Sequence, residues 1–227
     1  MKKRSKRYGA AAEKVKGAGR AEVSEAVKLL KSLPVTRFDE TVSVAFKLGI
    51  DPKKSDQIVR GSFNLPHGIG KERKVIVFAE GKDAEAAKQA GAVESGGLEL
   101  VKKVQDGWLD FDVAISTPDM MRHVGKLGKI LGPAGKMPSP KSGTVTPNVA
   151  VAVNEYRAGK VEFRNDVDGN LHIPVGRKSF AQEALTENVE ALIEHVKGMR
   201  PATAKGTFIQ RITVSSTMNP SVELVVK

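Results

Sequence analysis

The fold is decided by residues 65–79, LPHGIGKERKVIVFA, where a break rich in proline and glycine runs into an apolar stretch. Before the break, apolar and polar residues alternate, whereas Val75 to Ala79 are apolar without interruption. An unbroken apolar strand is typical of a parallel sheet that is covered on both faces. The sequence therefore predicts a change from one type of sheet to another at this point.

After the break, predicted strands and helices alternate. Val113-Ala114-Ile115 is a second apolar run, and a shorter strand is expected at Ala92 to Glu94. Helices are expected at about 83–91 with Asp83 as its cap, at 97–105, after Pro118, and at 148–158. Such alternation predicts a small parallel sheet with crossover helices. Residues 68–159 are thus expected to form an α/β Rossmann-like domain.

The segments on either side of this domain show local strand pairing. Val42, Val44, Phe46 and Leu48 alternate with polar or small residues, which predicts a strand with one apolar face. A helix capped by Ser24 precedes it and a strand at 58–65 follows. After residue 159, strands at 161–164 and 171–173 flank a hairpin signal at 166–170, followed by a helix at 180–198 and strands at 208–217 and 222–226.

Two separate terminal subdomains would be small for independent stability. We therefore expect residues 1–67 and 160–227 to form one α+β domain of the split β-α-β type, with the parallel-sheet domain of residues 68–159 inserted in it.

The chain is basic, with 37 Lys and Arg against 26 Asp and Glu, a net charge of +11. Residues 1–67 carry 15 basic and 7 acidic residues, so most of the excess lies there. Such a charge favours a polyanionic partner, although a basic arm can equally be a solvated tail. The chain has no cysteine, no signal peptide after its basic start and no long apolar run, so we expect a cytoplasmic protein with no membrane partner.

Enzymatic chemistry finds little support. Around Gly135-Lys136, Ile130 replaces the first glycine of a phosphate loop and Met137 replaces its hydroxyl residue. The four histidines lie far apart without the spacing of metal ligands. We expect no catalytic residue, metal or cofactor, and keep a nucleotide-dependent enzyme on the parallel sheet as the alternative.

Two constellations suit RNA. Residues 120–141 contain no acidic residue and are rich in glycine and proline, and their basic residues are Arg122, Lys126, Lys129, Lys136 and Lys141. A flexible solvated lid is the alternative for this loop. On the predicted strand at 208–217, Arg211, Thr213, Ser215 and Thr217 alternate with Ile212, Val214 and Ser216, which suits 2′-hydroxyls and phosphates but is also ordinary for an exposed strand.

Several strings, in order along the chain, resemble the bacterial L-one family of large-subunit ribosomal proteins. They include Lys47-Leu48-Gly49-Ile50-Asp51-Pro52, Leu65-Pro66-His67-Gly68, Gly128-Lys129-Ile130-Leu131-Gly132-Pro133, Phe163-Arg164-Asn165-Asp166 and Lys205-Gly206-Thr207-Phe208. The resemblance implies a two-domain protein of the mobile stalk, monomeric within the ribosome. It also implies binding to large-subunit rRNA, help in releasing exit-site tRNA, and repression of translation through the mRNA of its own operon.

Carried onto this sequence, the resemblance places the rRNA surface at Arg37, Phe38, Thr41, Arg164, Asp166, His172, Thr217 and Met218. The basic residues of the 120–141 loop are expected to face exit-site tRNA. Asn219 departs from the glycine expected beside Met218, which leaves the shape of this turn open. A free-standing translational repressor is a third interpretation of the same residues.

Overall fold

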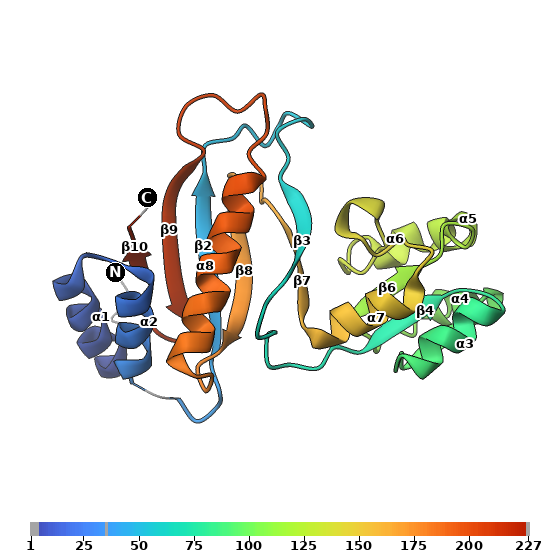
Figure 1. Cartoon of the computed structure of the whole chain (residues 1–227), viewed down its shortest axis with the longest axis horizontal. Coiled ribbons are helices and arrows are strands. Elements are labelled where there is room, and N and C mark those ends of the chain that lie inside the picture. The colour runs from blue at the N-terminus through green and yellow to red at the C-terminus, as the bar shows by residue number, and fades with distance from the viewer. Residues whose placement is uncertain (1–4, 35, 226–227) are drawn as a thin grey trace. The chain divides into compact units, whose positions relative to one another are not determined.

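The computed structural model describes residues 5–34 and 36–225. These residues form two compact units (Figure 1). Unit 1 takes the chain up to Gly70 and again from Val161 onward, and unit 2 consists of Lys71–Lys160. None of the helices in the described residues is long and apolar enough to span a membrane.

The main sheet of unit 1 combines strands from both halves of the sequence. Its order is β1-β10-β9-β2-β8, and β2 lies antiparallel between β9 and β8 (Figure 1). The strands are β1 (Arg20–Ala21), β2 (Thr41–Leu48), β8 (Asn170–Arg177), β9 (Ile209–Ser216) and β10 (Val222–Leu224). A strand from the first part of the chain is thus held between two strands from the last part.

The core of unit 1 lies between this sheet and the helices α2 (Val23–Ser32) and α8 (Gln182–Gly198). Val42, Val44, Phe46 and Leu48 are all buried, which confirms the strand predicted from their alternation. Burial of each such side chain contributes about 1.5–3 kcal/mol. The helix α1 (Lys6–Ala18), which the sequence did not suggest, packs Val15 against the same core.

The hairpin predicted around residues 166–170 is wrong. The strand β7 (Lys160–Arg164) pairs with β3 (Arg60–Asn64) in a separate two-stranded sheet, while β8 pairs with β2. Asn165 continues this association, because its amide donates to the Val59 carbonyl at 3.0 Å and its side chain accepts from the Val59 amide at 2.9 Å. The turn forms, but its two strands diverge into different sheets.

Unit 2 contains the predicted parallel sheet, in the order β5-β4-β6. The strands are β4 (Val75–Phe78), β5 (Glu94–Gly96) and β6 (Val113–Ser116). Ile76 and Phe78 pack on the side of α4 (Leu98–Gln105), whereas Val75 and Val77 pack on the side of α3 (Lys82–Gln89) and α7 (Val149–Ala158). Both faces of β4 are covered, which accounts for its unbroken apolar run.

The predicted helix starts need correction. Ser24 and Asp83 lie inside the first turns of α2 and α3, whose N-caps are Glu22 and Gly81. Gly81 has φ 58°, a conformation that glycine adopts without strain. It takes the N-cap position that was predicted for Asp83, and α3 begins at Lys82. Pro118 lies in a turn ahead of α5 (Met121–Val124) rather than in its first turn, and β5 begins at Glu94, two residues after the predicted start at Ala92.

The segment at residues 120–141 is not the open loop that its glycines suggest. It contains the short helices α5 (Met121–Val124), η1 (Gly125–Leu127), α6 (Gly128–Leu131) and η2 (Pro140–Ser142). Val124, Leu127 and Leu131 are fully buried at helical spacing, and this apolar pattern overrides the local preference of the glycines.

Candidate nucleic-acid interface

Thr41 and Thr217, predicted from opposite parts of the sequence, meet at one end of the main sheet. The Thr41 amide donates to Thr217 Oγ1 at 3.1 Å, and the Thr217 hydroxyl donates to the Thr41 carbonyl at 3.3 Å. Met218 follows in the turn and its side chain is 47% exposed. The Thr217 hydroxyl therefore has a structural task, whereas Met218 is available to a partner.

Arg37 and Phe38 lie in the segment that leads into β2, and both are exposed, Phe38 to 52%. Asp39 anchors this segment to the connection between β8 and α8. Its carboxylate accepts from the amide and hydroxyl of Ser179 at 3.1 and 2.8 Å, and its carbonyl accepts from Arg177 at 3.0 Å. Phe38 is thus an exposed ring on a fixed backbone, a type of side chain on which unpaired bases stack.

Asn219 does not disturb this end of the sheet. Among the described residues only glycines have positive φ, so Asn219 needs no left-handed backbone. Its side chain is turned inward and only 8% exposed, and Nδ2 donates to Glu40 Oε2 at 2.8 Å. The asparagine therefore belongs to the support of the turn rather than to its outer surface.

Asp166 and His172 form a second group. Asp166 Oδ1 accepts from the amides of Asp168 and Asn170 at 2.9 and 2.7 Å, and His172 Nε2 lies 3.8 Å from Oδ2. The hydrogen bonds from the backbone and side chain of Asn170 lower the pKa of Asp166 below its ordinary value of 3.8. Arg164 is exposed at the end of β7, in the two-stranded sheet.

The Thr41–Thr217 pair and the Asp166–His172 pair lie on one side of the main sheet. Thr41 pairs with Arg177 and Ala45 with His172, so the groups lie four residue steps apart along β2. At about 3.3 Å per residue this is roughly 13 Å. We call this side, opposite α2 and α8, the open face; its side chains include Thr41, Ser43, Lys47, His172, Arg211, Thr213 and Ser215.

The open face is hollowed between β8, β2 and β9. The hollow has a volume of about 500 Å³, and its polar lining consists of Lys47, Asn170, His172, Gln210, Arg211 and Thr213. Lys47 was not among the predicted site residues, although its place on the polar side of the predicted strand could have revealed it. Its Nζ donates to the Asp168 carbonyl at 2.8 Å, next to the Asp166 group.

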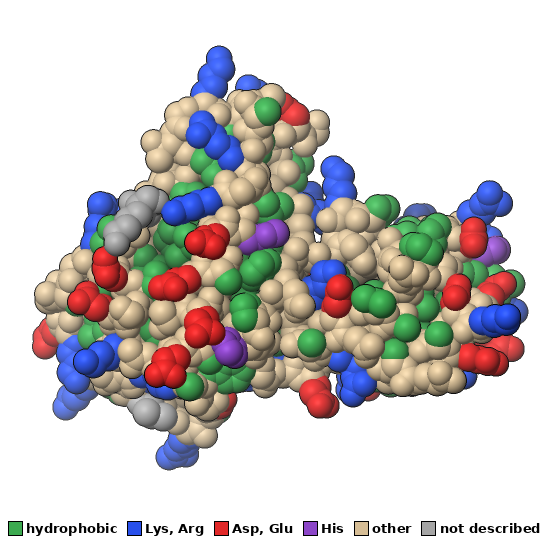
Figure 2. Space-filling model, in the orientation of Figure 1, with side chains coloured by type: hydrophobic (Ala, Val, Ile, Leu, Met, Phe, Trp, Pro, Cys, Tyr) green, Lys and Arg blue, Asp and Glu red, His purple; other side chains and the backbone are tan. Residues whose placement is uncertain are grey.

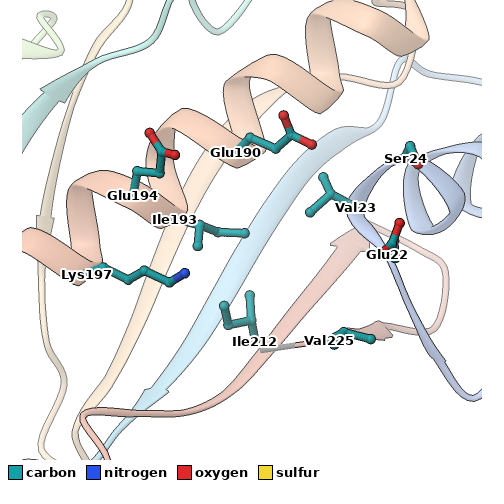
Figure 3. A pocket seen from close by; sticks show the side chains of 9 residues that line it. All are labelled: Glu22, Val23, Ser24, Glu190, Ile193, Glu194, Lys197, Ile212 and Val225. Atoms are coloured by element: carbon teal, nitrogen blue, oxygen red, sulfur yellow. The ribbon is translucent and has the colours of Figure 1, made fainter. Parts of the chain in front are cut away.

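The helix-covered side of unit 1 has the opposite character. Along α8, Glu183, Glu187, Glu190 and Glu194 are all exposed, and Figure 2 shows acidic side chains gathered on this side. A hollow of about 260 Å³ there is lined by Glu22, Glu190 and Glu194 together with Lys197 (Figure 3). Carboxylates repel phosphate, so the charge distribution favours RNA on the open face.

The basic residues of unit 2 divide into two kinds. Arg122, Lys126, Lys129 and Lys141 are exposed. Lys136 is only partly exposed, because its Nζ donates to the carbonyls of Phe111 and Leu109 at 2.6 and 3.0 Å. Four of the five predicted residues can therefore reach a phosphate chain, and Lys136 instead holds the segment onto the body of unit 2.

Nothing in the described residues suggests a metal centre. Across 5–34 and 36–225, no group of three or more His, Asp or Glu side chains could hold an ion. The candidate site is a surface of hydrogen-bonding, basic and exposed apolar side chains.

The chain is similar to known ribosomal proteins over nearly its whole length. The model of the ribosomal protein L1p/L10e family matches residues 29–220. The large ribosomal subunit protein uL1 of Kosmotoga olearia is 53% identical over 224 residues, which cover 99% of this chain and 97% of that protein. The large ribosomal subunit protein uL1 of Cutibacterium acnes is 53% identical over 222 residues, covering 98% and 96%.

Proposed function

Because the chain belongs to the ribosomal protein L1p/L10e family, we propose that it is a constituent of the large ribosomal subunit that binds large-subunit rRNA. The observation that carries this proposal is the exposure of Phe38 and Met218 at the end of a sheet face that also presents Lys47 and Arg211. Apolar contacts beside cations and hydroxyls suit a folded RNA, whose bases and backbone are recognised together.

In this proposal, unit 1 is the rRNA-binding domain and unit 2 is a Rossmann-like domain inserted in it. The rRNA surface consists of Arg37, Phe38, Thr41, Arg164, Asp166, His172, Thr217 and Met218, to which the open face adds Lys47 and Arg211. The cations bind phosphates, and Asp166 Oδ2 lies 3.8 Å from His172 Nε2.

Unit 2 serves a different RNA in this proposal, the deacylated tRNA that leaves the exit site. The supporting observation is that Arg122, Lys126, Lys129 and Lys141 are exposed on short helices without a neighbouring acidic residue in the segment. Contacts with phosphates carry no sequence information, which fits a surface that must accept every tRNA.

The resemblance supports one further role for unit 1. A protein that binds an rRNA element can bind a similar element in its own operon mRNA and repress translation. We propose that the protein is cytoplasmic and that it acts as a monomer within the ribosome, with rRNA and operon mRNA competing for one surface.

The experiment that tests the main proposal combines sedimentation with footprinting. Large subunits lacking this protein should take it up in sedimentation, and rRNA should be protected at one discrete site. Specific RNA binding without uptake by subunits would favour a free-standing repressor. Saturable binding of ATP or NAD with no discrete rRNA footprint would favour the enzyme.

A further inference from the structure

Four polar side chains are buried directly beneath the turn that carries Thr217 and Met218. Glu40 is fully buried, and Ser216, Asn219 and Lys178 are 2%, 8% and 8% exposed. We call these four residues the Glu40 cluster. It lies on the inner side of the sheet end, so it is separate from the residues proposed to contact RNA.

The Glu40 carboxylate organises the cluster. Its Oε2 accepts from Ser216 Oγ at 2.7 Å and from Asn219 Nδ2 at 2.8 Å, and Lys178 Nζ lies 3.6 Å away. Asn219 Nδ2 also donates to Ser216 Oγ at 2.9 Å. One carboxylate oxygen thus joins the two residues that flank the turn, one on each side.

The same cluster holds the segment that leads to Phe38. Lys178 Nζ donates to the carbonyls of Leu33 and Pro34 at 2.9 and 3.3 Å, and Asn219 Nδ2 lies 3.4 Å from the Pro34 carbonyl. The Lys178 amide donates to the Glu40 carbonyl at 2.8 Å. The end of α2, the start of β2 and the turn after β9 are therefore tied to one point.

Stability alone does not explain this arrangement. The second oxygen of Glu40, Oε1, is the buried side-chain polar atom that lacks a hydrogen-bond partner among the described residues. Burying a carboxylate is costly even when it is paired, and apolar packing of similar volume is often at least as stable. Directional bonds, in contrast, define one geometry, which apolar packing does less well.

We propose that Glu40 and Asn219 are positioning residues that fix the directions in which Phe38 and Met218 project toward RNA. The inference rests on the proposed function, because it assumes that these two side chains form the apolar part of the rRNA contact. Both positioning residues lie within two residues of a proposed RNA contact. Glu40 follows Phe38 by two residues, and Asn219 directly follows Met218.

Moving the carboxylate from position 40 to position 219, and the amide from 219 to 40, tests the proposal in the full-length protein. Asn219→Asp places a second carboxylate against Glu40, while Glu40→Gln/Asn219→Asp restores a donor and an acceptor with the same side-chain lengths and the same total charge. We expect Asn219→Asp to weaken binding of an rRNA fragment about tenfold, the loss of one packed contact, and the double exchange to recover most of it.

The readout specific to positioning is NMR of the free protein. The Thr217 amide and the Met218 methyl signals should shift and broaden in Asn219→Asp and return in the double exchange. Because paired carboxylates can unfold a protein, Ser216→Ala is the second variant, and it should move the same signals less. Unchanged Thr217 and Met218 signals in both folded variants would overturn the proposal.

A double-mutant cycle that combines Met218→Ala with Asn219→Asp separates this inference from the proposed function. If the cluster positions Met218, this substitution weakens rRNA binding in the natural protein but adds little in the Asn219→Asp background. Equal losses in both backgrounds would show that the cluster acts only on stability. No loss in the natural protein would contradict the RNA surface itself, and the NMR signals would then still decide whether the cluster holds the turn.

Discussion

At the scale of single residues, Met218 gives the clearest test of the RNA surface. Met218→Ala should weaken specific rRNA binding by about 1–3 kcal/mol, because a packed contact is removed. The melting temperature should hardly change, since Met218 is 47% exposed in the protein alone. Equilibrium binding and thermal unfolding measure the two effects, with Val151→Ala, an exposed valine on α7, as the matched control.

The neighbouring Thr217 should behave differently. Thr217→Ala should lower both rRNA affinity and the free energy of unfolding, the latter by about 1 kcal/mol, because its hydroxyl bonds both backbone groups of Thr41. Thr217→Ser keeps the hydroxyl and should retain stability. A Thr217→Ala protein that matches the natural one in stability would show that these hydrogen bonds contribute nothing.

Asp166 predicts a pH dependence whose sign follows from its lowered pKa. Since the folded state favours the ionised carboxylate, Asp166 adds stability above its ordinary pKa of 3.8, and this contribution is lost as the pH falls through the lower folded value. Asp166→Asn should lack it. Urea unfolding from about pH 5 to about pH 2 should show the two proteins converging in stability, and a constant difference would contradict this assignment.

At the scale of elements, the short helices of unit 2 carry the tRNA prediction. Neutralising Lys126, Lys129 and Lys141 to Gln should flatten the salt dependence of tRNA association, because each lost phosphate contact removes about one released counterion. Specific rRNA binding should stay nearly intact. The measurement is tRNA dissociation from ribosomes across a salt series.

Lys136 supplies the control for that prediction. Lys136→Gln should lower the free energy of unfolding of unit 2, since its ammonium bonds two carbonyls, with a smaller effect on tRNA. Unchanged tRNA kinetics in the triple variant, together with weakened rRNA binding, would reverse the assignment of the two surfaces.

The elements also show what sequence reasoning can reach. The strand at Thr41–Leu48 and the parallel strand at Val75–Phe78 follow from their apolar patterns, because those patterns record burial on one face or on two. The pairing of β7 with β3 does not follow from the sequence, because β3 lies about a hundred residues earlier. Local residue patterns carry no information on which distant strands pair. The site shows the same division: resemblance supplied Met218, while burial of Glu40 required the structure.

At the scale of the whole molecule, unit 1 should suffice for rRNA recognition. A protein joining residues 1–70 to 161–227 through a short glycine linker should fold and keep most of the affinity, because the core of unit 1 is formed by these residues alone. Retaining Gly68 matters, since its carbonyl accepts from the buried Asn188. Binding only at the non-specific level by the folded protein would show that unit 2 is needed.

Hydroxyl-radical footprinting of the full-length protein, with and without large-subunit rRNA, tests the central claim most directly. Phe38, His172 and Met218 are exposed and chemically reactive, and Trp108 and Met121 provide partly exposed reporters in unit 2. We predict that rRNA protects Phe38, His172 and Met218 and leaves Trp108 and Met121 reactive. Protection of the unit 2 side chains, with Phe38 and Met218 as reactive as in the free protein, would contradict the account.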